Sequence, residues 1–139
     1  MKSHRRKFIK NTGLLCGGIG LGATGLVTSC TPITYVSATL IENKLLIKKA
    51  DWGESSFVVV KSKRLPKPLY VCQLSTDNYV ALLMECTHKQ CEVRPSSQGL
   101  NCPCHGSEFD RTGKVLEGPA REDLAEFTVA SDEENIYIG

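Results

Sequence analysis

Two short motifs, at 86–91 and 102–107, constrain this chain more than any other feature of its sequence. Together they hold four cysteines and two histidines: Cys86, His88, Cys91, Cys102, Cys104 and His105. The whole chain has seven cysteines and three histidines, so most of its soft ligands fall within one short stretch. Ligands of this kind at this spacing predict a metal centre, a disulfide framework, or both.

Three interpretations of the motifs differ in how many of the six residues they use. A tetrahedral zinc site needs two cysteines and two histidines and leaves two cysteines without a role. A metal-free disulfide scaffold uses the four cysteines and leaves both histidines without one. A binuclear iron–sulfur site, with two cysteines on one iron and two histidines on the other, uses all six.

The segments CTHKQC and CPCHGS resemble the paired cluster-binding loops of Rieske iron–sulfur proteins, and the resemblance continues through EFDRTGKVLEGPA. It covers most of residues 70–139. It implies one [2Fe-2S] cluster, with cysteine ligands on the inner iron, histidine ligands on the outer iron, and a disulfide between the two loops. Carried across by position, these are Cys86 and Cys102, His88 and His105, and Cys91 and Cys104, respectively.

The same resemblance assigns four further residues that would tune the cluster. Ser107 matches a serine whose hydroxyl binds a bridging sulfide, and Gly106 would let the backbone approach the cluster closely. Pro119, in the segment GPA, matches a loop that covers the cluster from a third side, although an ordinary turn is the simpler interpretation. Phe109 stands where high-potential members carry a tyrosine that donates to a cysteine sulfur. Its lack of a hydroxyl predicts a lower potential.

The resemblance implies one-electron transfer, and departures from it bear on the partner. Quinol-oxidising members have an apolar Leu-Gly pair where this chain has Lys89 and Gln90, and a lysine is costly in an apolar pocket. We therefore expect an electron carrier, or a small subunit of an oxidoreductase, that exchanges electrons with a cytochrome or a larger redox protein. It would be an electron-transfer component rather than a stand-alone enzyme.

Three other functions are compatible with parts of the sequence. The alternative is the iron–sulfur subunit of a quinol-oxidising cytochrome bc-type complex, with quinol as a possible partner. An oxygenase needs a further mononuclear iron site with two more histidines, which the chain lacks. A purely structural role would not explain the histidines.

The N-terminal segment predicts export. Paired arginines at 5–6 precede an uncharged run that ends in LVTSC, so 1–29 is typical of a twin-arginine signal peptide. Cys30 closes a lipobox-like sequence and is expected to carry a lipid, with 30–43 as a tether. An uncleaved helix and an unmodified cysteine remain alternatives. We expect a membrane-anchored lipoprotein on the periplasmic side of a bacterial cell envelope.

Beyond Cys30 the sequence favours a small all-β domain. Residues 31–139 carry twelve basic and fifteen acidic side chains, which argues against nucleic-acid binding. Short apolar runs separated by turn residues predict strands, including a hairpin that pairs 68–74 with 78–86. The expected fold is a Rieske-type antiparallel β-sandwich or barrel over 44–139, with a cluster-binding subdomain formed by two loops. Cys72, within a strand, is expected to be a buried, inert thiol.

Overall fold

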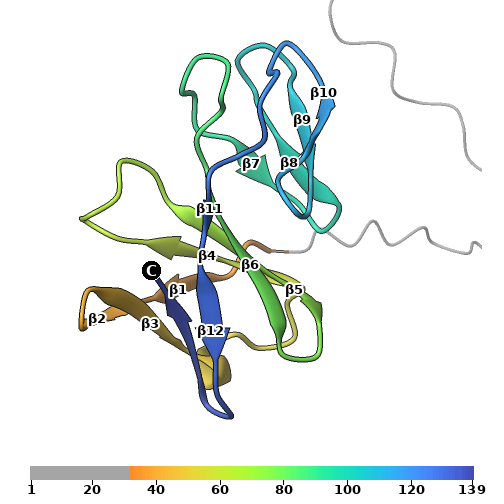
Figure 1. Cartoon of the computed structure of the whole chain (residues 1–139). Helices are drawn as coiled ribbons and strands as arrows, with labels where there is room; N and C mark the ends of the chain where they lie inside the picture. The colour runs from red at the N-terminus through yellow and green to blue at the C-terminus, as the bar shows by residue number, and fades with distance from the viewer. Residues whose placement is uncertain (1–31) are drawn as a thin grey trace, which may run out of the picture. The chain divides into compact units, whose positions relative to one another are not determined.

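The computed structural model describes residues 32–139, which form an almost wholly β structure (Figure 1). The predicted signal segment 1–29 and Cys30 lie outside the described residues. In the described part, the single helical element is a 3-10 turn, η1 (Lys49–Asp51). Within the same range, no helix has the length and apolar character needed to cross a bilayer. The all-β fold class is therefore confirmed.

The strands form three sheets. The central sheet has the order β1 (Tyr35–Ser37), β4 (Phe57–Lys61), β5 (Leu69–Ser75), β6 (Asn78–Leu83) and β11 (Glu126–Phe127). A second sheet has the order β12 (Val129–Ser131), β13 (Asn135–Ile138), β3 (Lys44–Lys48) and β2 (Thr39–Ile41). The third has the order β10 (Val115–Glu117), β9 (Glu108–Asp110), β8 (Gly99–Asn101) and β7 (Arg94–Pro95). Among the described strands, all pairs are antiparallel except β1 with β4.

The central sheet is buried on both faces, which explains why its strands are continuous apolar runs. Because successive side chains of a strand alternate between faces, Cys72 belongs to one hydrophobic core and Val71 to the other. The core that holds Val71 also holds Ile47 and Ile136 of the second sheet. The core that holds Cys72 continues into the two cysteine motifs, through Cys86 and Cys102. One face of the central sheet thus supports the candidate site directly.

The structure confirms the predicted hairpin but shortens the predicted tether. The hairpin between 68–74 and 78–86 is confirmed, because β5 and β6 pair along their length. The proposed tether over 30–43 is too long, because Tyr35–Ser37 and Thr39–Ile41 are strands of two different sheets. The hydrogen bonds of β1 to β4 and of β2 to β3 place these residues inside the domain, where backbone groups find partners.

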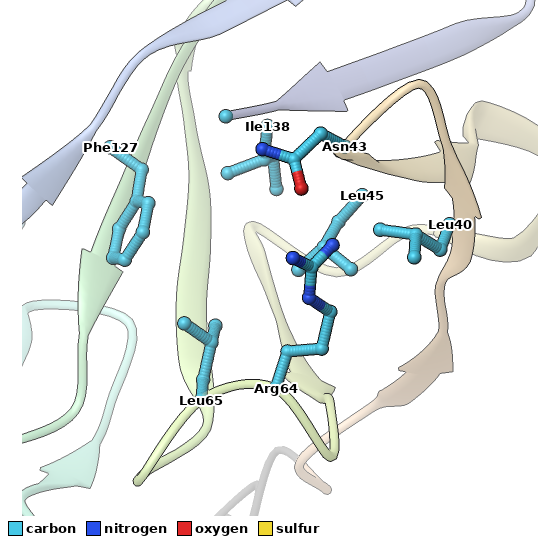
Figure 2. Close-up of a pocket in the computed structure, with 8 residues that line it drawn as sticks. Leu40, Asn43, Leu45, Arg64, Leu65, Phe127 and Ile138 are labelled. Carbon is cyan, nitrogen blue, oxygen red and sulfur yellow. The ribbon is translucent and has the colours of Figure 1, made fainter.

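A shallow groove of about 250 Å³ lies between the β2–β3 hairpin and the loop that joins β4 to β5 (Figure 2). Leu40 and Leu45 line it from the hairpin, and Leu65 lines it from the loop. The side chain of Arg64 extends from the loop toward the hairpin. The groove shows that β2 and the β4–β5 loop share one face of the molecule.

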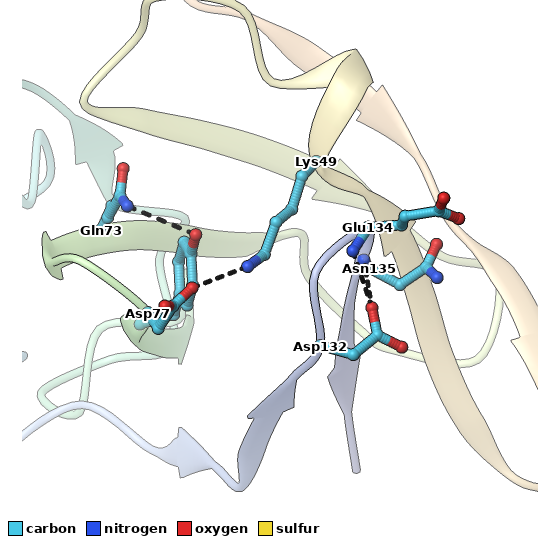
Figure 3. A network of polar contacts seen from close by, with 7 residues as sticks. Lys49, Gln73, Asp77, Asp132, Glu134 and Asn135 are labelled. Carbon is cyan, nitrogen blue, oxygen red and sulfur yellow. Dashed lines mark hydrogen bonds and ion pairs between the residues drawn. The ribbon is translucent and has the colours of Figure 1, made fainter.

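A polar network fastens the β5–β6 hairpin to the second sheet (Figure 3). The Lys49 ammonium donates to Asp77 Oδ1 at 2.8 Å and lies 5.5 Å from the centre of the Tyr79 ring. The backbone N–H of Lys49 donates to the carbonyl of Glu134 at 2.8 Å. An exposed ion pair of this kind contributes little to stability, so the network is a local brace.

Candidate metal centre

The first motif forms a tight loop that follows β6. The backbone N–H of Cys86 donates to the carbonyl of Cys91, and the N–H of Gln90 donates to the carbonyl of Cys86, both at 2.8 Å. A bridge between Glu85 and Glu92 closes the base of the loop. Gln90 has φ +57°, a left-handed conformation that is uncommon for a residue with a side chain.

The second motif forms the same kind of loop between β8 and β9. The N–H of Cys102 donates to the carbonyl of Ser107 at 2.8 Å, and the N–H of Gly106 donates to the carbonyl of Cys102 at 3.0 Å. Gly106 has φ +80° and occupies the position that Gln90 occupies in the first loop. Both loops therefore present a cysteine at the start of one repeated turn.

The four cysteines separate into two kinds. Cys86 and Cys102 are buried, with 1% and 3% of their surface exposed, and both are free thiols. Cys91 and Cys104 form a disulfide that joins the two loops, with their Cα atoms 6.5 Å apart. The Cys102 sulfur lies within 4.8 Å of both disulfide sulfurs, but sulfurs already bonded to each other do not supply thiolate ligands. Free, buried thiols are thus available on each loop.

The two histidines meet at the open side of the loops. The ring centres of His88 and His105 are 4.9 Å apart, and the ring planes are inclined by 80°. His105 is exposed, whereas His88 is half-buried. The Nδ1 atom of His88 is buried and has no hydrogen-bond partner in the described part of the chain. Such an atom needs an explanation, and a metal ion bound to it is one.

A third loop, at 118–122, is attached to both of the others. The N–H of Ala120 donates to the Ser107 hydroxyl oxygen at 3.0 Å. The Thr87 hydroxyl donates to the carbonyl of Glu122 at 2.7 Å. Ser107 is fully buried and accepts from Ala120, so its own proton stays free to be donated.

The protein-family model named Rieske [2Fe-2S] domain matches residues 38–128, about two thirds of the chain. The chain belongs to the Rieske [2Fe-2S] domain family. A [2Fe-2S] cluster is the cofactor of this family, and the donor set fits it. Two buried free thiols and two histidines, one of them with an unpartnered buried nitrogen, match the mixed ligation of a Rieske cluster.

Similar proteins include subunits of larger complexes. The cytochrome b6-f complex iron-sulfur subunit of Synechococcus sp. (strain WH7803) is 46% identical over 56 residues, 38% of this chain and 31% of that protein. The cytochrome b6-f complex iron-sulfur subunit 1 of Nostoc sp. (strain PCC 7120) is 28% identical over 127 residues, 88% of this chain and 64% of that protein. The matched part of this chain therefore spans from about a third to about two thirds of the length of these relatives.

The fold also matches a solved Rieske structure. The cyanobacterial plasma membrane Rieske protein PetC3 from Synechocystis PCC 6803 shares 30% sequence identity and superposes with a TM-score of 0.57. The match covers 66% of this chain and 94% of that one. The sequence similarity and the fold similarity thus agree.

The structure places the expected tuning residues of the Rieske domain around the two loops. Phe109 is buried in the same core as Cys86 and Cys102. Pro119 is exposed in the third loop, beside Thr87 and His88. The φ of Gly106, +80°, is a conformation that favours glycine, and a Cβ atom there would meet no described protein atom within 4 Å.

Sequence reasoning missed two contacts. Thr87 was not singled out, although it ties the first loop to the third. Arg111 donates through Nε and Nη2 to the Cys72 sulfur, at 3.2 and 3.0 Å, and through Nη2 to the Gln73 carbonyl at 2.7 Å. These residues are about forty positions apart, and no motif links them. Cys72 is fully buried, as expected, but its sulfur accepts hydrogen bonds.

Proposed function

We propose that this Rieske protein carries single electrons at the surface of a membrane, with its cluster held by Cys86, Cys102, His88 and His105. The observation that carries the proposal is the pairing of one buried free thiol and one histidine on each of two loops cross-linked at Cys91–Cys104. The cluster, when bound, accepts and releases one electron.

The residues around the site have distinct roles in this proposal. The disulfide holds the loops together, and the buried Phe109 excludes water from the side of the core. The Ser107 proton stabilises the charge of the reduced site by hydrogen bonding. His105 is exposed and His88 is half-buried, so we expect electrons to pass to a partner on the side of His105. The buried Nδ1 of His88 would hold the metal, which would leave Nε2 as the ring nitrogen of His88 that is not a ligand.

The proposal includes export and anchoring. Residues 1–29 would act as a twin-arginine signal, and Cys30 would carry a lipid that keeps the domain on the periplasmic side of the membrane. The domain itself begins earlier than the sequence predicts, because Thr34 already accepts a hydrogen bond from the N–H of Val59 at 2.9 Å. We therefore replace the tether at 30–43 by a linker of a few residues after Cys30. The partner would be a cytochrome or a larger oxidoreductase.

A second candidate function is the iron–sulfur subunit of a quinol-oxidising complex. The similarity to iron-sulfur subunits of cytochrome b6-f complexes favours it. Two features of this chain favour the carrier instead. Lys89 and Gln90 at the tip of the first loop are exposed and polar, and the short linker leaves little reach for the large head movement that shuttling within a complex requires.

Purification of the full chain from its native membranes tests these proposals. We expect two irons and two labile sulfides per chain, and an electron paramagnetic resonance spectrum with the low average g-value of mixed ligation. Cys86→Ser and His105→Ala should abolish both. One zinc and no sulfide would exclude the cluster. Co-migration with a b-type cytochrome on a native gel would favour the quinol-oxidising complex over the carrier.

A further inference from the structure

Exposed apolar side chains gather at the start of the domain. Among the described residues, six large hydrophobic side chains are markedly exposed, and four of these lie within 33–41: Ile33, Tyr35, Leu40 and Ile41. Tyr35 has 59% of its surface exposed on the edge strand β1. Scattered single apolar residues need no explanation, but four within nine residues, leading into and along two edge strands, are a candidate interaction surface.

A basic loop lies beside this segment. The stretch 61–67 reads KSKRLPK and contains four basic residues and no acidic one. Its first residue, Lys61, pairs with Ser37 at the end of β1, and its ammonium lies 4.7 Å from the centre of the Tyr35 ring. Arg64 and Leu65 share a groove with Leu40 (Figure 2). We call these eight residues the base patch: Ile33, Tyr35, Leu40, Ile41, Lys61, Lys63, Arg64 and Lys67.

The distribution of charge along the chain agrees with the basic character of this loop. Residues 31–69 hold seven basic and three acidic side chains, a net charge of +4. Residues 70–139, which include all three loops of the metal centre, hold five basic and twelve acidic side chains, a net charge of −7. Glu42, at the β2–β3 turn, is the acidic side chain nearest in sequence to the exposed apolar group. An anionic surface would attract the base patch and repel the part that carries the site.

The short distance between Cys30 and the domain supports a lipid surface as the partner of the base patch. Thr34 is fixed to the domain through its carbonyl and through a 2.8 Å contact between its hydroxyl and that of Ser55. Cys30 is four residues earlier, and four extended residues reach at most about 14 Å. A lipid on Cys30 would therefore hold the start of β1 next to the bilayer.

We propose that the base patch lies on the surface of an anionic phospholipid bilayer. The four apolar side chains enter the headgroup region, while the four basic side chains contact lipid phosphates, as in other interfacial surfaces. The aromatic ring of Tyr35 and the lysine above it suit the boundary between headgroups and acyl chains. The inference draws on the proposed lipidation for position, but the affinity for anionic lipid resides in the patch itself.

Amine footprinting of the full-length, membrane-extracted protein tests this proposal. The protein is bound to vesicles of phosphatidylcholine alone or mixed with phosphatidylglycerol, and labelled with a membrane-impermeant amine reagent. Mass spectrometry then reads each lysine. We expect several-fold less labelling of Lys61, Lys63 and Lys67 on the anionic vesicles. Lys89 and Lys114 serve as internal controls and should label equally on both. Equal labelling of all five lysines on both vesicles would overturn the proposal.

Paired charge reversals give an independent test. In the full chain with Cys30→Ser, Lys63→Glu with Arg64→Glu should weaken sedimentation with anionic vesicles by roughly tenfold or more. The matched control, Arg94→Glu with Lys114→Glu, makes the same charge change elsewhere and keeps the same N-terminal segment. Equal losses in both variants would mean that net charge alone acts, which contradicts the proposal. The mass of the native N-terminal peptide reports lipidation separately, so failure of the anchor is distinguishable from failure of the patch.

Discussion

Phe109 is the residue at which the resemblance to high-potential Rieske proteins leads us to expect a tyrosine. Its ring is almost fully buried, with 1% exposed, in the core that also contains the thiols of Cys86 and Cys102. A phenyl ring in this place excludes water but donates no hydrogen bond. Hydrogen bonds to the sulfur atoms are one of the factors that set the potential of an iron–sulfur cluster.

Phe109→Tyr should raise the midpoint potential, because the added hydroxyl can donate to a cysteine sulfur and stabilise the reduced state. We expect a shift on the order of 59 mV, which is a tenfold change in a one-electron equilibrium. Voltammetry of the intact protein measures it. Phe127→Tyr, in the other hydrophobic core, is the matched control and should leave the potential unchanged. An unshifted potential in Phe109→Tyr would show that the hydroxyl does not reach a sulfur.

Much of the site at this scale could be predicted from sequence, because metal ligation demands particular side chains at particular spacings. The cysteine and histidine motifs needed no alignment to be found. The Thr87 contact to Glu122 and the Arg111 contact to Cys72 could not be predicted. Each joins segments far apart in the chain through common side chains with no spacing rule, and the fold alone brings them together.

At the scale of elements, the two ligand loops are copies of one turn. Each begins with a cysteine whose N–H and carbonyl both bond within the loop, and each has a left-handed residue at the fifth position. The second loop uses glycine there, whereas the first uses Gln90, which costs about 1 kcal/mol or more in backbone strain. The sequence motifs predict that loops exist, but the shared hydrogen bonds emerge only from the structure.

The disulfide between these loops should protect the cluster rather than create it. Cys91→Ser combined with Cys104→Ser should assemble a cluster that is lost faster, because the cross-link removes about 3 kcal/mol of loop-closure freedom for a loop of this length. Decay of visible absorbance at elevated temperature measures the loss. Cys72→Ser provides a cysteine substitution outside the loops for comparison. A double variant as long-lived as the parent would assign the disulfide no protective role.

The turn between β9 and β10 depends on one carboxylate. Asp110 Oδ1 accepts from the Thr112 hydroxyl and from the N–H groups of Thr112 and Lys114. Partial burial by itself would raise the pKa of Asp110, but these hydrogen bonds and nearby Lys114 outweigh it and lower the pKa below its ordinary value. The stabilisation is therefore complete above about pH 3.9 and is lost as the pH falls through the lowered pKa.

Asp110→Asn should destabilise the domain at neutral pH by no more than about 1 kcal/mol. The difference from the parent should shrink as acid protonates the parent's Asp110. Thermal unfolding followed by circular dichroism between about pH 6 and pH 3 tests both statements. Asp51→Asn removes an exposed carboxylate of η1 for comparison. A difference that grows on acidification would contradict the assignment.

At the scale of the whole molecule, the division of charge should govern which partners react. The exposed residues Glu108 and Glu117 are paired across β9 and β10, between the second and third loops. No ion pair to either carboxylate occurs in the part of the chain that the structure describes. Like charges directly opposite each other are destabilising, so a cationic partner relieves the repulsion.

A cationic cobalt(III) complex should oxidise the reduced protein more slowly as salt rises, whereas ferricyanide should react faster as salt rises. Glu108→Gln with Glu117→Gln should flatten both dependences. Glu133→Gln with Glu134→Gln makes the same charge change in the acidic turn before β13. In this control variant, both rates should depend on salt more steeply than in the Glu108 and Glu117 variant. Stopped-flow kinetics measures the rates. Equal flattening by the two variants would mean that net charge, not the local pair, controls the encounter.

Sequence reasoning predicted the strands of the whole molecule better than their partners. Apolar runs identify β4 and β5, but both faces of these strands are buried, so alternation could not indicate which layer covers each face. The strands β1 and β2 have three residues each and exposed apolar positions. Their membership of the domain depends on backbone pairing that no side-chain pattern reveals.

The early start of β1 would give the folded domain a fixed distance from the membrane. With Thr34 already bonded to β4, only a few residues separate Cys30 from the central sheet. If Cys30 carries the proposed lipid, the folded domain would set the height of His105 above the bilayer. Encounters with a partner would then become a search in two dimensions. To take the electron, a partner would need a redox centre at the same height above the bilayer. A high affinity for this protein would not replace that match.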